Sequence, residues 1–153
     1  MPAFGLPAFV LPNIPIGKVV QIVYGSTTTQ TTSSSSAYAD TTLRATITPT
    51  STNNKVLVFV TQAGCGKTTN STSLRLQLFR NAEVVAQIEA GAAFTGTVTD
   101  NYIGACAMNY LDTPATNTAV TYKTQFASAS NTASVIVQIS QALSSIVLME
   151  VTP

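Results

Sequence analysis

The chain has 153 residues, enough for one domain with a sizeable core, yet only 8% are charged and the formal net charge is +1. Seven scattered basic residues leave no electrostatic footprint for nucleic acid and no basic patch for a membrane surface, so we expect neither partner. The 25 Thr residues and the many Val and Ile residues are β-branched, which favours strands over helices. So few charges predict that much of the surface is covered by partners, the alternative being a solvated surface rich in Ser and Thr.

Residues 1–17, "MPAFGLPAFVLPNIPIG", differ in composition from the rest of the chain. Four prolines exclude a regular helix or a central strand, and there is no charged side chain. We expect an extended apolar arm that docks on a partner, or else lies as a strap across its own domain. The docking residues are predicted to be the large apolar ones: Phe4, Leu6, Phe9, Val10, Leu11, Ile14 and Ile16.

From residue 18 to residue 153 we expect a single β domain. Short apolar or alternating segments are separated by turn residues roughly every ten positions, the pattern of a sandwich or barrel. The nine predicted strands cover residues 18–24, 41–47, 55–62, 73–80, 84–89, 101–111, 119–127, 134–140 and 145–151. The predicted fold class is therefore all-β: an antiparallel β-sandwich of the jelly-roll type, with an immunoglobulin-like sandwich as second choice.

The stretch "VLVFVTQAGCGKTT" suggests a phosphate-binding loop, because an apolar run is followed by Gly66, Lys67 and Thr68. A nucleotide-binding loop needs a further glycine at position 61, which is Thr61, and a helix after the lysine. An alternating segment follows instead. We therefore expect a hairpin loop over residues 64–73 and no bound nucleotide.

Other chemistry is sparse. The chain has no His, which removes the commonest general base and most zinc sites, and its six acids suggest neither a catalytic pair nor a metal site. We expect no enzymatic activity, no cofactor and no metal. Cys65 and Cys106 are expected to be free and buried, and Glu150 to point outward or to pair with a basic residue. The tyrosines at 102, 110 and 122 are expected at sheet edges within the core, or else on an exposed face that binds sugar or a subunit.

From Gly17 onward, about 130 of the 153 residues resemble small tailed-phage virion proteins. The resemblance lies in "GKVVQIVYGSTTTQTTSSSSAYADTTLRATITPTSTNNKVLVFV", followed in order by "LRLQLFRN", "YLDTPAT", "TYKTQFAS" and "IVLMEV". It implies a jelly-roll decoration, head-fibre or tail-fibre module, often trimeric.

Together these features predict a virion structural protein. The favoured form is a homotrimeric capsid decoration (cement) protein, held to the major capsid protein or another virion protein by the N-terminal arm. We expect it on the capsid surface rather than on the tail. The alternative is a tail-fibre or receptor-binding tip, whose loops at residues 26–36, 64–73 and 91–99 recognise a host surface glycan.

Overall fold

The computed structural model describes residues 17–68, 71–131 and 133–153, so the predicted arm, apart from Gly17, lies outside the described residues. These residues form ten strands and one short 3-10 turn, η1 (Ile139–Gln141), and all paired strands are antiparallel. The strands are β1 (Val19–Thr27), β2 (Thr31–Ser33), β3 (Ala39–Ile47), β4 (Lys55–Lys67), β5 (Leu74–Arg80), β6 (Glu83–Ala92), β7 (Asn101–Asp112), β8 (Val120–Ser128), β9 (Val135–Val137) and β10 (Ser144–Val151).

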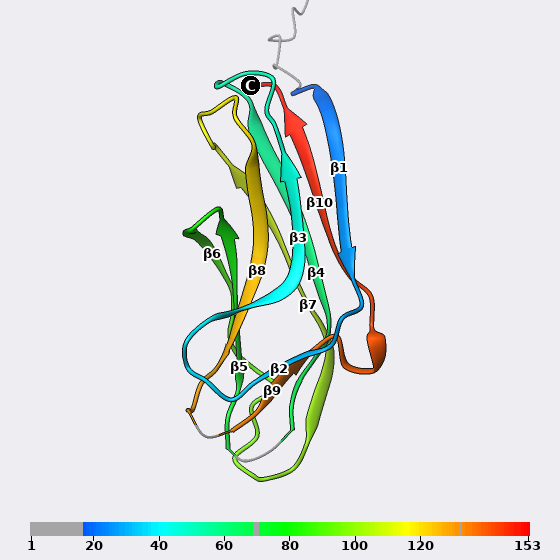
Figure 1. Cartoon of the computed structure of the whole chain (residues 1–153), viewed down its shortest axis with the longest axis vertical. Coiled ribbons are helices and arrows are strands. Elements are labelled where there is room, and N and C mark those ends of the chain that lie inside the picture. Colours follow the sequence, from blue (N-terminus) through cyan, green and yellow to red (C-terminus); the bar gives the residue numbers. More distant parts are fainter. Residues whose placement is uncertain (1–16, 69–70, 132) are drawn as a thin grey trace, which may run out of the picture.

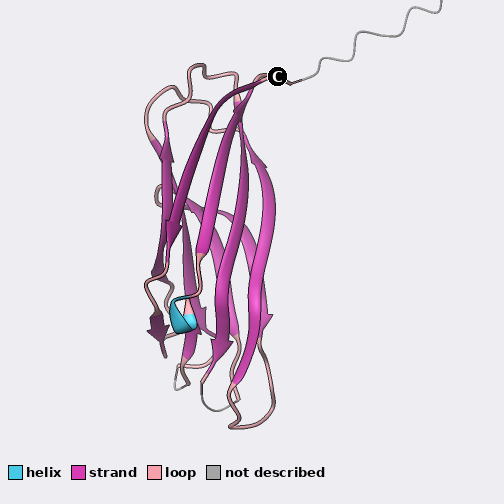
Figure 2. Ribbon diagram, turned by 90° about the vertical axis from the view of Figure 1, so that its right-hand side faces the viewer, coloured by secondary structure: helices cyan, strands magenta, loops and turns pink. Residues whose placement is uncertain are grey.

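The strand order is that of a jelly roll. One sheet has the order β1-β10-β4-β7, with the short strands β9 and β2 continuing from the far end of β4, and the second sheet has the order β3-β8-β5-β6. The strands of both sheets run along the long axis of the molecule (Figures 1 and 2). Successive main strands cross from one sheet to the other, except that β5 and β6 form a hairpin within the second sheet, as in two Greek keys wound together. The predicted jelly-roll sandwich is confirmed.

Alternation along the strands builds the core between the sheets. Val56, Val58 and Val60 point inward from β4, and Leu74, Leu76 and Leu78 point inward from β5; all are at most 2% exposed. The buried side chains form two apolar clusters, one around Val58 and one around Leu76. Pleating places every second residue on one face of a strand, so each strand contributes a row of side chains to this core.

Buried polar side chains also bridge the two sheets. Thr124 of β8 donates a hydrogen bond to Gln62 Oε1 of β4 at 2.8 Å, and Gln62 Nε2 donates to Ser144 Oγ at 3.2 Å. Thr124 also shares a hydrogen bond with Thr41. Because buried polar groups are costly when unpaired, these bonds fix how the sheets are positioned relative to each other.

Two strand predictions needed correction. β4 runs on to Lys67, five residues past its predicted end, because residues 65–67 continue to pair with β7 and, at Gly66 and Lys67, with β9. The segment predicted as one strand at residues 134–140 is the short β9 followed by η1, where Gln138 and Ser140 adopt φ of 54° and 53°. The polar tract at 26–36 contains the short strand β2, which pairs with β9.

Candidate partner-binding surface

The outer face of the β1-β10-β4-β7 sheet carries two complete cross-strand rows that are apolar except for Asn109 at the end of one. The first row joins Ile22, Met149, Leu57 and Leu111, and the second joins Tyr24, Val147, Phe59 and Asn109. The intervening residues of these strands, such as Val58 and Leu148, are the ones buried in the core. The two rows therefore face away from the sandwich.

We call the following residues the apolar face: Ile22, Tyr24, Leu57, Phe59, Leu111, Val147, Met149 and Val151. Ile22 is 61% exposed, Tyr24 59% and Leu111 51%, although a solvated sheet normally alternates apolar inside and polar outside. Among the described residues of these four strands, the only charged side chain on this outer face is that of Lys55, opposite Val151 in the row next to the first. A contiguous exposed apolar surface of this kind is typical of the interaction sites of folded domains.

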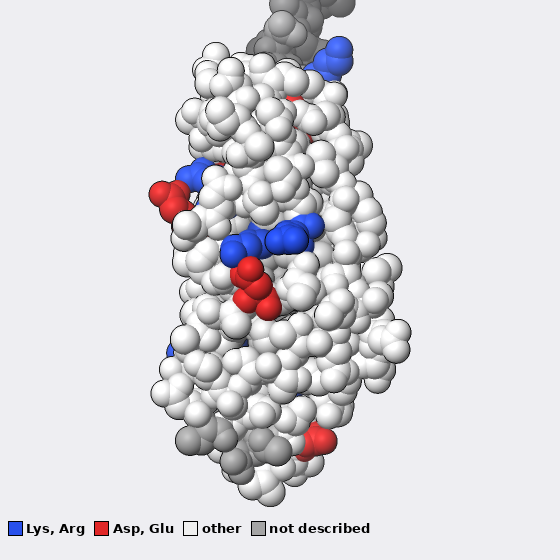
Figure 3. Space-filling view, in the orientation of Figure 1, with Lys and Arg blue, Asp and Glu red and all other residues white. Residues whose placement is uncertain are grey.

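The outer face of the second sheet is more polar. One of its rows joins Asp40, Gln125, Gln77 and Gln87, all polar, and the next joins two charged and two apolar residues, Arg44, Lys123, Phe79 and Val84. In the view of Figure 3, which looks onto β3 and β8, one group of basic and acidic side chains lies near the middle of this face. One side of the sandwich is suited to water and the other to a partner.

Two segments of the sequence indicate the apolar face, although their composition predicted only that they form strands. "KVLVFV" and "SIVLMEV" are apolar at consecutive positions rather than at alternate ones. Consecutive apolar residues are typical of strands covered on both faces. In this sandwich the second sheet covers only one of those faces.

The seven predicted docking residues of the arm lie outside the described residues: Phe4, Leu6, Phe9, Val10, Leu11, Ile14 and Ile16. The structure does place the point from which the arm leaves. Lys18 N donates to Thr152 Oγ1 at 2.9 Å, and Thr152 N donates to Lys18 O at 3.0 Å. The arm therefore starts at the end of the β1–β10 pair, in the sheet that carries the apolar face.

The Gly-Lys-Thr stretch is part of a strand and not a hairpin loop with an exposed lysine. Lys67, the last residue of β4, is fully buried, and its ammonium group donates to the Thr97 carbonyl oxygen at 2.7 Å. Gly64 has φ of +60°, and a Cβ there would lie 2.4 Å from Ile139 N; a Cβ on Gly66 would lie 2.6 Å from Asn101 O. These glycines are required by close backbone contacts, so the likeness to a phosphate loop has a packing origin.

The acidic residues serve the fold. Glu150 was expected to point outward or to meet a basic residue; instead it is buried and accepts hydrogen bonds from Asn54 Nδ2 at 2.6 Å, Gln21 Nε2 at 2.6 Å and Thr50 N at 2.7 Å. Burial alone would raise the pKa of Glu150, but these hydrogen bonds outweigh it and hold the pKa at about 2. Asp112 is 5% exposed and pairs with Arg80 at 3.1 Å.

The cysteines and tyrosines occupy different environments. Cys65 and Cys106 are free and buried, as predicted. Tyr122 is fully buried, whereas Tyr102 is 46% exposed, so the expectation of a core position holds for the first and is wrong for the second.

In residues 17–68, 71–131 and 133–153, no three His, Cys, Asp or Glu side chains gather in a way that could hold a metal ion. No helix in the described part of the chain is long and apolar enough to cross a membrane.

Comparison with known proteins gives weak structural likenesses and no match in sequence. No protein-family model and no curated sequence matches the chain. Among solved structures, the chain is similar to the infectious bursal disease virus VP2 subviral particle, with a TM-score of 0.48 and 12% identity over 99% of this chain and 44% of that one. It is also similar to the structure of the infectious bursal disease virus Gt strain, with a TM-score of 0.41, 13% identity and the same coverage. The chain spans less than half the length of these two chains, and likenesses at this level indicate nothing about its function.

Proposed function

We propose that this protein is a virion structural subunit: a homotrimer that decorates a capsid and is anchored to it by its N-terminal arm. The observation that carries the proposal is the contrast between the two outer faces of the jelly roll. The polar sheet faces solvent, and the apolar face packs against other copies of the same chain. The resemblance of residues 17–151 to small tailed-phage virion proteins supports the same reading.

The width of the apolar face suits a trimer. Four strands at about 4.8 Å spacing form a sheet about 19 Å wide. Three such sheets arranged as the sides of a triangle would each lie about 5.5 Å from the threefold axis, close to half of the ~10 Å at which two sheets pack. Side chains of the size of Phe59 and Met149 would fill that space and leave no central channel.

The buried area is modest. The apolar face runs along the strands from Val147 to Val151, about 13 Å, so each copy offers roughly 250 Å² of flat surface. Three copies would bury about 750 Å² of it, less than a standard two-protein interface, so the trimer in this proposal also uses contacts outside this face. The near absence of charge on the apolar face means that no buried ion would have to be desolvated on assembly.

The arm supplies the second contact in this proposal. Its large apolar residues and its lack of charge suit an apolar groove on a shell protein. Seventeen extended residues reach about 50 Å, far enough to leave the trimer and lie along a neighbouring surface. Three arms joined in one trimer would bind with greater avidity than one arm alone.

The mass of the purified full chain in solution tests the trimer. Light scattering is expected to give three times the 16.0 kDa of one chain. A monomer at micromolar concentration would overturn the trimer and, with it, the assignment of the apolar face to a contact between copies. Binding to undecorated shells tests the capsid location separately, since a tail-fibre tip would remain trimeric and would not bind them.

A further inference from the structure

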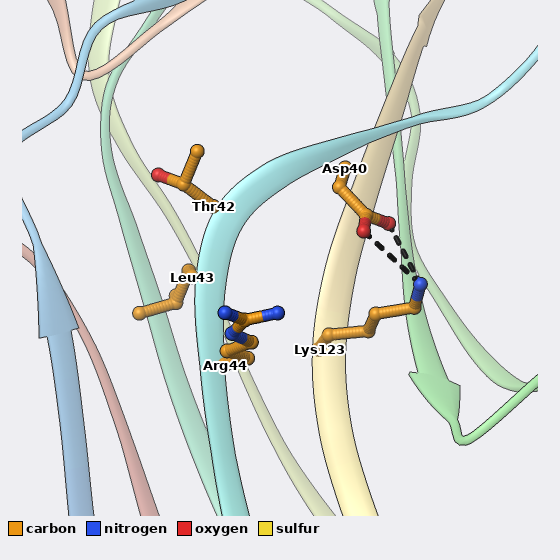
Figure 4. A pocket seen from close by; sticks show the side chains of 5 residues that line it. All are labelled: Asp40, Thr42, Leu43, Arg44 and Lys123. Atoms are coloured by element: carbon orange, nitrogen blue, oxygen red, sulfur yellow. Dashed lines mark hydrogen bonds and ion pairs between the residues drawn. The ribbon is translucent and has the colours of Figure 1, made fainter.

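A small cavity opens on the polar outer face, far from the apolar face. Its volume is about 170 Å³, and it is lined by Asp40, Thr42, Leu43, Arg44 and Lys123. β3 bends sharply at Thr42, and the three charged side chains lie around this bend, with Lys123 reaching toward Asp40 from β8 (Figure 4). Only 13 residues of the whole chain are Lys, Arg, Asp or Glu, so three at one cavity is a marked concentration.

The bend in β3 is an irregularity in the sheet. Asp40 pairs with Gln125 and Arg44 pairs with Lys123, so three residues of β3 stand opposite the single residue Thr124. Thr42, the middle residue of the three, has φ of 71°, which is costly for a β-branched side chain. Bulges that re-aim side chains, and backbone held in such conformations, are concentrated at binding sites.

The surrounding structure holds this irregular conformation in place. Thr42 Oγ1 shares a hydrogen bond of 2.9 Å with Thr27 Oγ1 at the end of β1. Leu43 is anchored in the core at 1% exposure, and buried Thr41 shares a hydrogen bond with Thr124 of the neighbouring strand β8. The cavity is therefore built by the fold and does not depend on a loop.

The charges around the cavity are unbalanced. Arg44 and Lys123 are direct neighbours across two strands, an arrangement of like charges that destabilises a sheet. One carboxylate is present: Asp40 bonds Lys123 at 2.9 Å and Gln125 Nε2 at 2.6 Å. Burial alone would raise the pKa of Asp40, but these contacts hold it below its usual value, so Asp40 is ionised at neutral pH. Two positive charges and one negative charge leave the site at +1.

Arg44 differs from the two other charged residues of the cavity, which are paired with each other. Within residues 17–68, 71–131 and 133–153, its guanidinium donates no hydrogen bond and forms no ion pair. A guanidinium presents a planar fork of donors that matches a carboxylate in a bidentate geometry. A single carboxylate would neutralise the +1 site and relieve the repulsion between Arg44 and Lys123.

We propose that this cavity binds the carboxylate of an acidic sugar residue, of the uronic or sialic acid type, with Arg44 as the main contact. The cavity has room for one such residue. Gln125, opposite Asp40, donates through Nε2 to the Asp40 carboxylate, and its Oε1 is an acceptor for a sugar hydroxyl beside the cavity. Gln77 and Gln87 continue the same row and are hydrogen-bonded to each other. The proposal goes beyond the structural role and does not depend on the trimer or on the arm.

Titration of the full-length protein with glucuronate, followed by amide NMR spectra, tests the inference. Glucose serves as the neutral sugar and acetate as the carboxylate without a sugar. We expect glucuronate to shift the amide signals of Thr42, Arg44 and Lys123 with saturation, and to bind at least tenfold more tightly than glucose or acetate. If glucose bound as tightly as glucuronate, or if glucuronate shifted the amide signals of other residues instead, the proposed site would be wrong. If acetate bound as tightly as glucuronate, the proposal that the ligand is a sugar would be wrong.

Two matched variants separate a specific contact from general attraction. Arg44→Gln removes the charge at the cavity, and Arg75→Gln removes a charge from β5 of the same sheet, away from the cavity lining. Arg44→Gln is expected to weaken glucuronate binding at least tenfold and Arg75→Gln less than twofold, with both variants keeping the wild-type amide spectrum outside the substituted position. An equal effect of the two substitutions would mean that only the net charge of the protein matters for binding, and it would overturn the proposed site.

Discussion

Tyr122 donates its phenolic hydrogen to Asp112 across the sandwich, with 2.6 Å between the two oxygens. Tyr122 belongs to β8 in the polar sheet and Asp112 ends β7 in the apolar sheet, so the bond ties the two sheets together. Asp112 also accepts hydrogen bonds from Arg80 of β5. Burial and this acidic neighbour raise the pKa of Tyr122, so the phenol is protonated and donates this hydrogen bond at neutral pH.

Replacing Tyr122 by Phe should therefore be costly. Tyr122→Phe leaves a buried carboxylate with one donor fewer, and we expect the free energy of unfolding to fall by about 2 kcal/mol. Urea denaturation at pH 7 measures it. Tyr110→Phe is the matched control, because the Tyr110 hydroxyl makes no hydrogen bond with any residue of the described chain, and it should change stability by less than about 0.5 kcal/mol. Equal losses in the two variants would contradict a specific role for the bond to Asp112.

Glu150 should make the stability of the domain pH-dependent. Its folded-state pKa of about 2 lies below the unfolded value of 4.5, so its contribution is fully present above about pH 5 and is lost as the pH falls toward 2. Glu150→Gln is expected to lower the free energy of unfolding by about 2 kcal/mol at pH 7 and by much less near pH 2.5.

Urea denaturation of both proteins at pH 7, 4 and 2.5 measures this difference. Glu83→Gln is the control, because the Glu83 side chain is 72% exposed and its pairing with Arg80 lies at the surface. A difference between wild type and Glu150→Gln that stays constant across the three pH values would contradict the low pKa of Glu150.

Local patterns were sufficient to predict most of the strands. Alternation is directly visible in "SLRLQLFR", where Leu74, Leu76 and Leu78 became core residues of β5. The extension of β4 to Lys67 was not visible, because Gly64 and Gly66 read as loop residues. Their small size serves close packing against residues distant in the sequence, Ile139 and Asn101. Contacts of that kind are decided by tertiary structure.

The consecutive apolar residues of β4 and β10 indicate strands covered on both faces, but they do not tell which residues point outward, and nothing in the sequence indicates the cavity. The outward position of Leu57 and Phe59 follows only when the second sheet is known to cover the other side of β4. The cavity depends on Thr42 at positive φ, against the preference of a β-branched residue, and on hydrogen bonds to Thr27 and between Thr41 and Thr124 that close long loops. The sequence "DTTLR" contains none of that information.

The apolar face can be tested at its centre. Phe59 lies between Val147 and Asn109 in the second row, and Phe59→Asp would place a charge inside the proposed interface. We expect a folded protein with unchanged secondary structure and an association weakened more than 100-fold, because a buried unpaired charge costs several kcal/mol. Light scattering over a concentration series measures the shift from trimer to monomer.

Thr46→Asp is the control for this substitution. Thr46 is outward on β3 in the polar sheet, where its hydroxyl meets that of Thr121 at 2.7 Å. A charge there faces water in the proposed trimer and should leave the mass unchanged. A trimer that persists in Phe59→Asp, or that dissociates equally in Thr46→Asp, would contradict assembly through the apolar face.

The arm is predicted to anchor the trimer and to contribute nothing to the folding of the sandwich. Replacing Phe4, Leu6 and Phe9 together by Ser removes three large apolar side chains that each contribute about 1.5–3 kcal/mol when buried. Binding to undecorated shells should fall at least about 100-fold, while the melting temperature and the solution mass stay those of the wild type. Co-sedimentation with shells, together with thermal unfolding, measures both.

A phenylalanine outside the arm provides the control for this last experiment. Phe94, in the turn between β6 and β7, is 62% exposed, so Phe94→Ser removes an exposed aromatic side chain without touching the arm. If the exposed apolar surface in general held the protein to the shell, Phe94→Ser would also weaken binding. If the arm is the specific anchor, only the arm variant loses its binding to the shell. A triple variant that still decorates shells normally would show that the arm is not the anchor. A triple variant with a lowered melting temperature would instead favour a strap across its own domain.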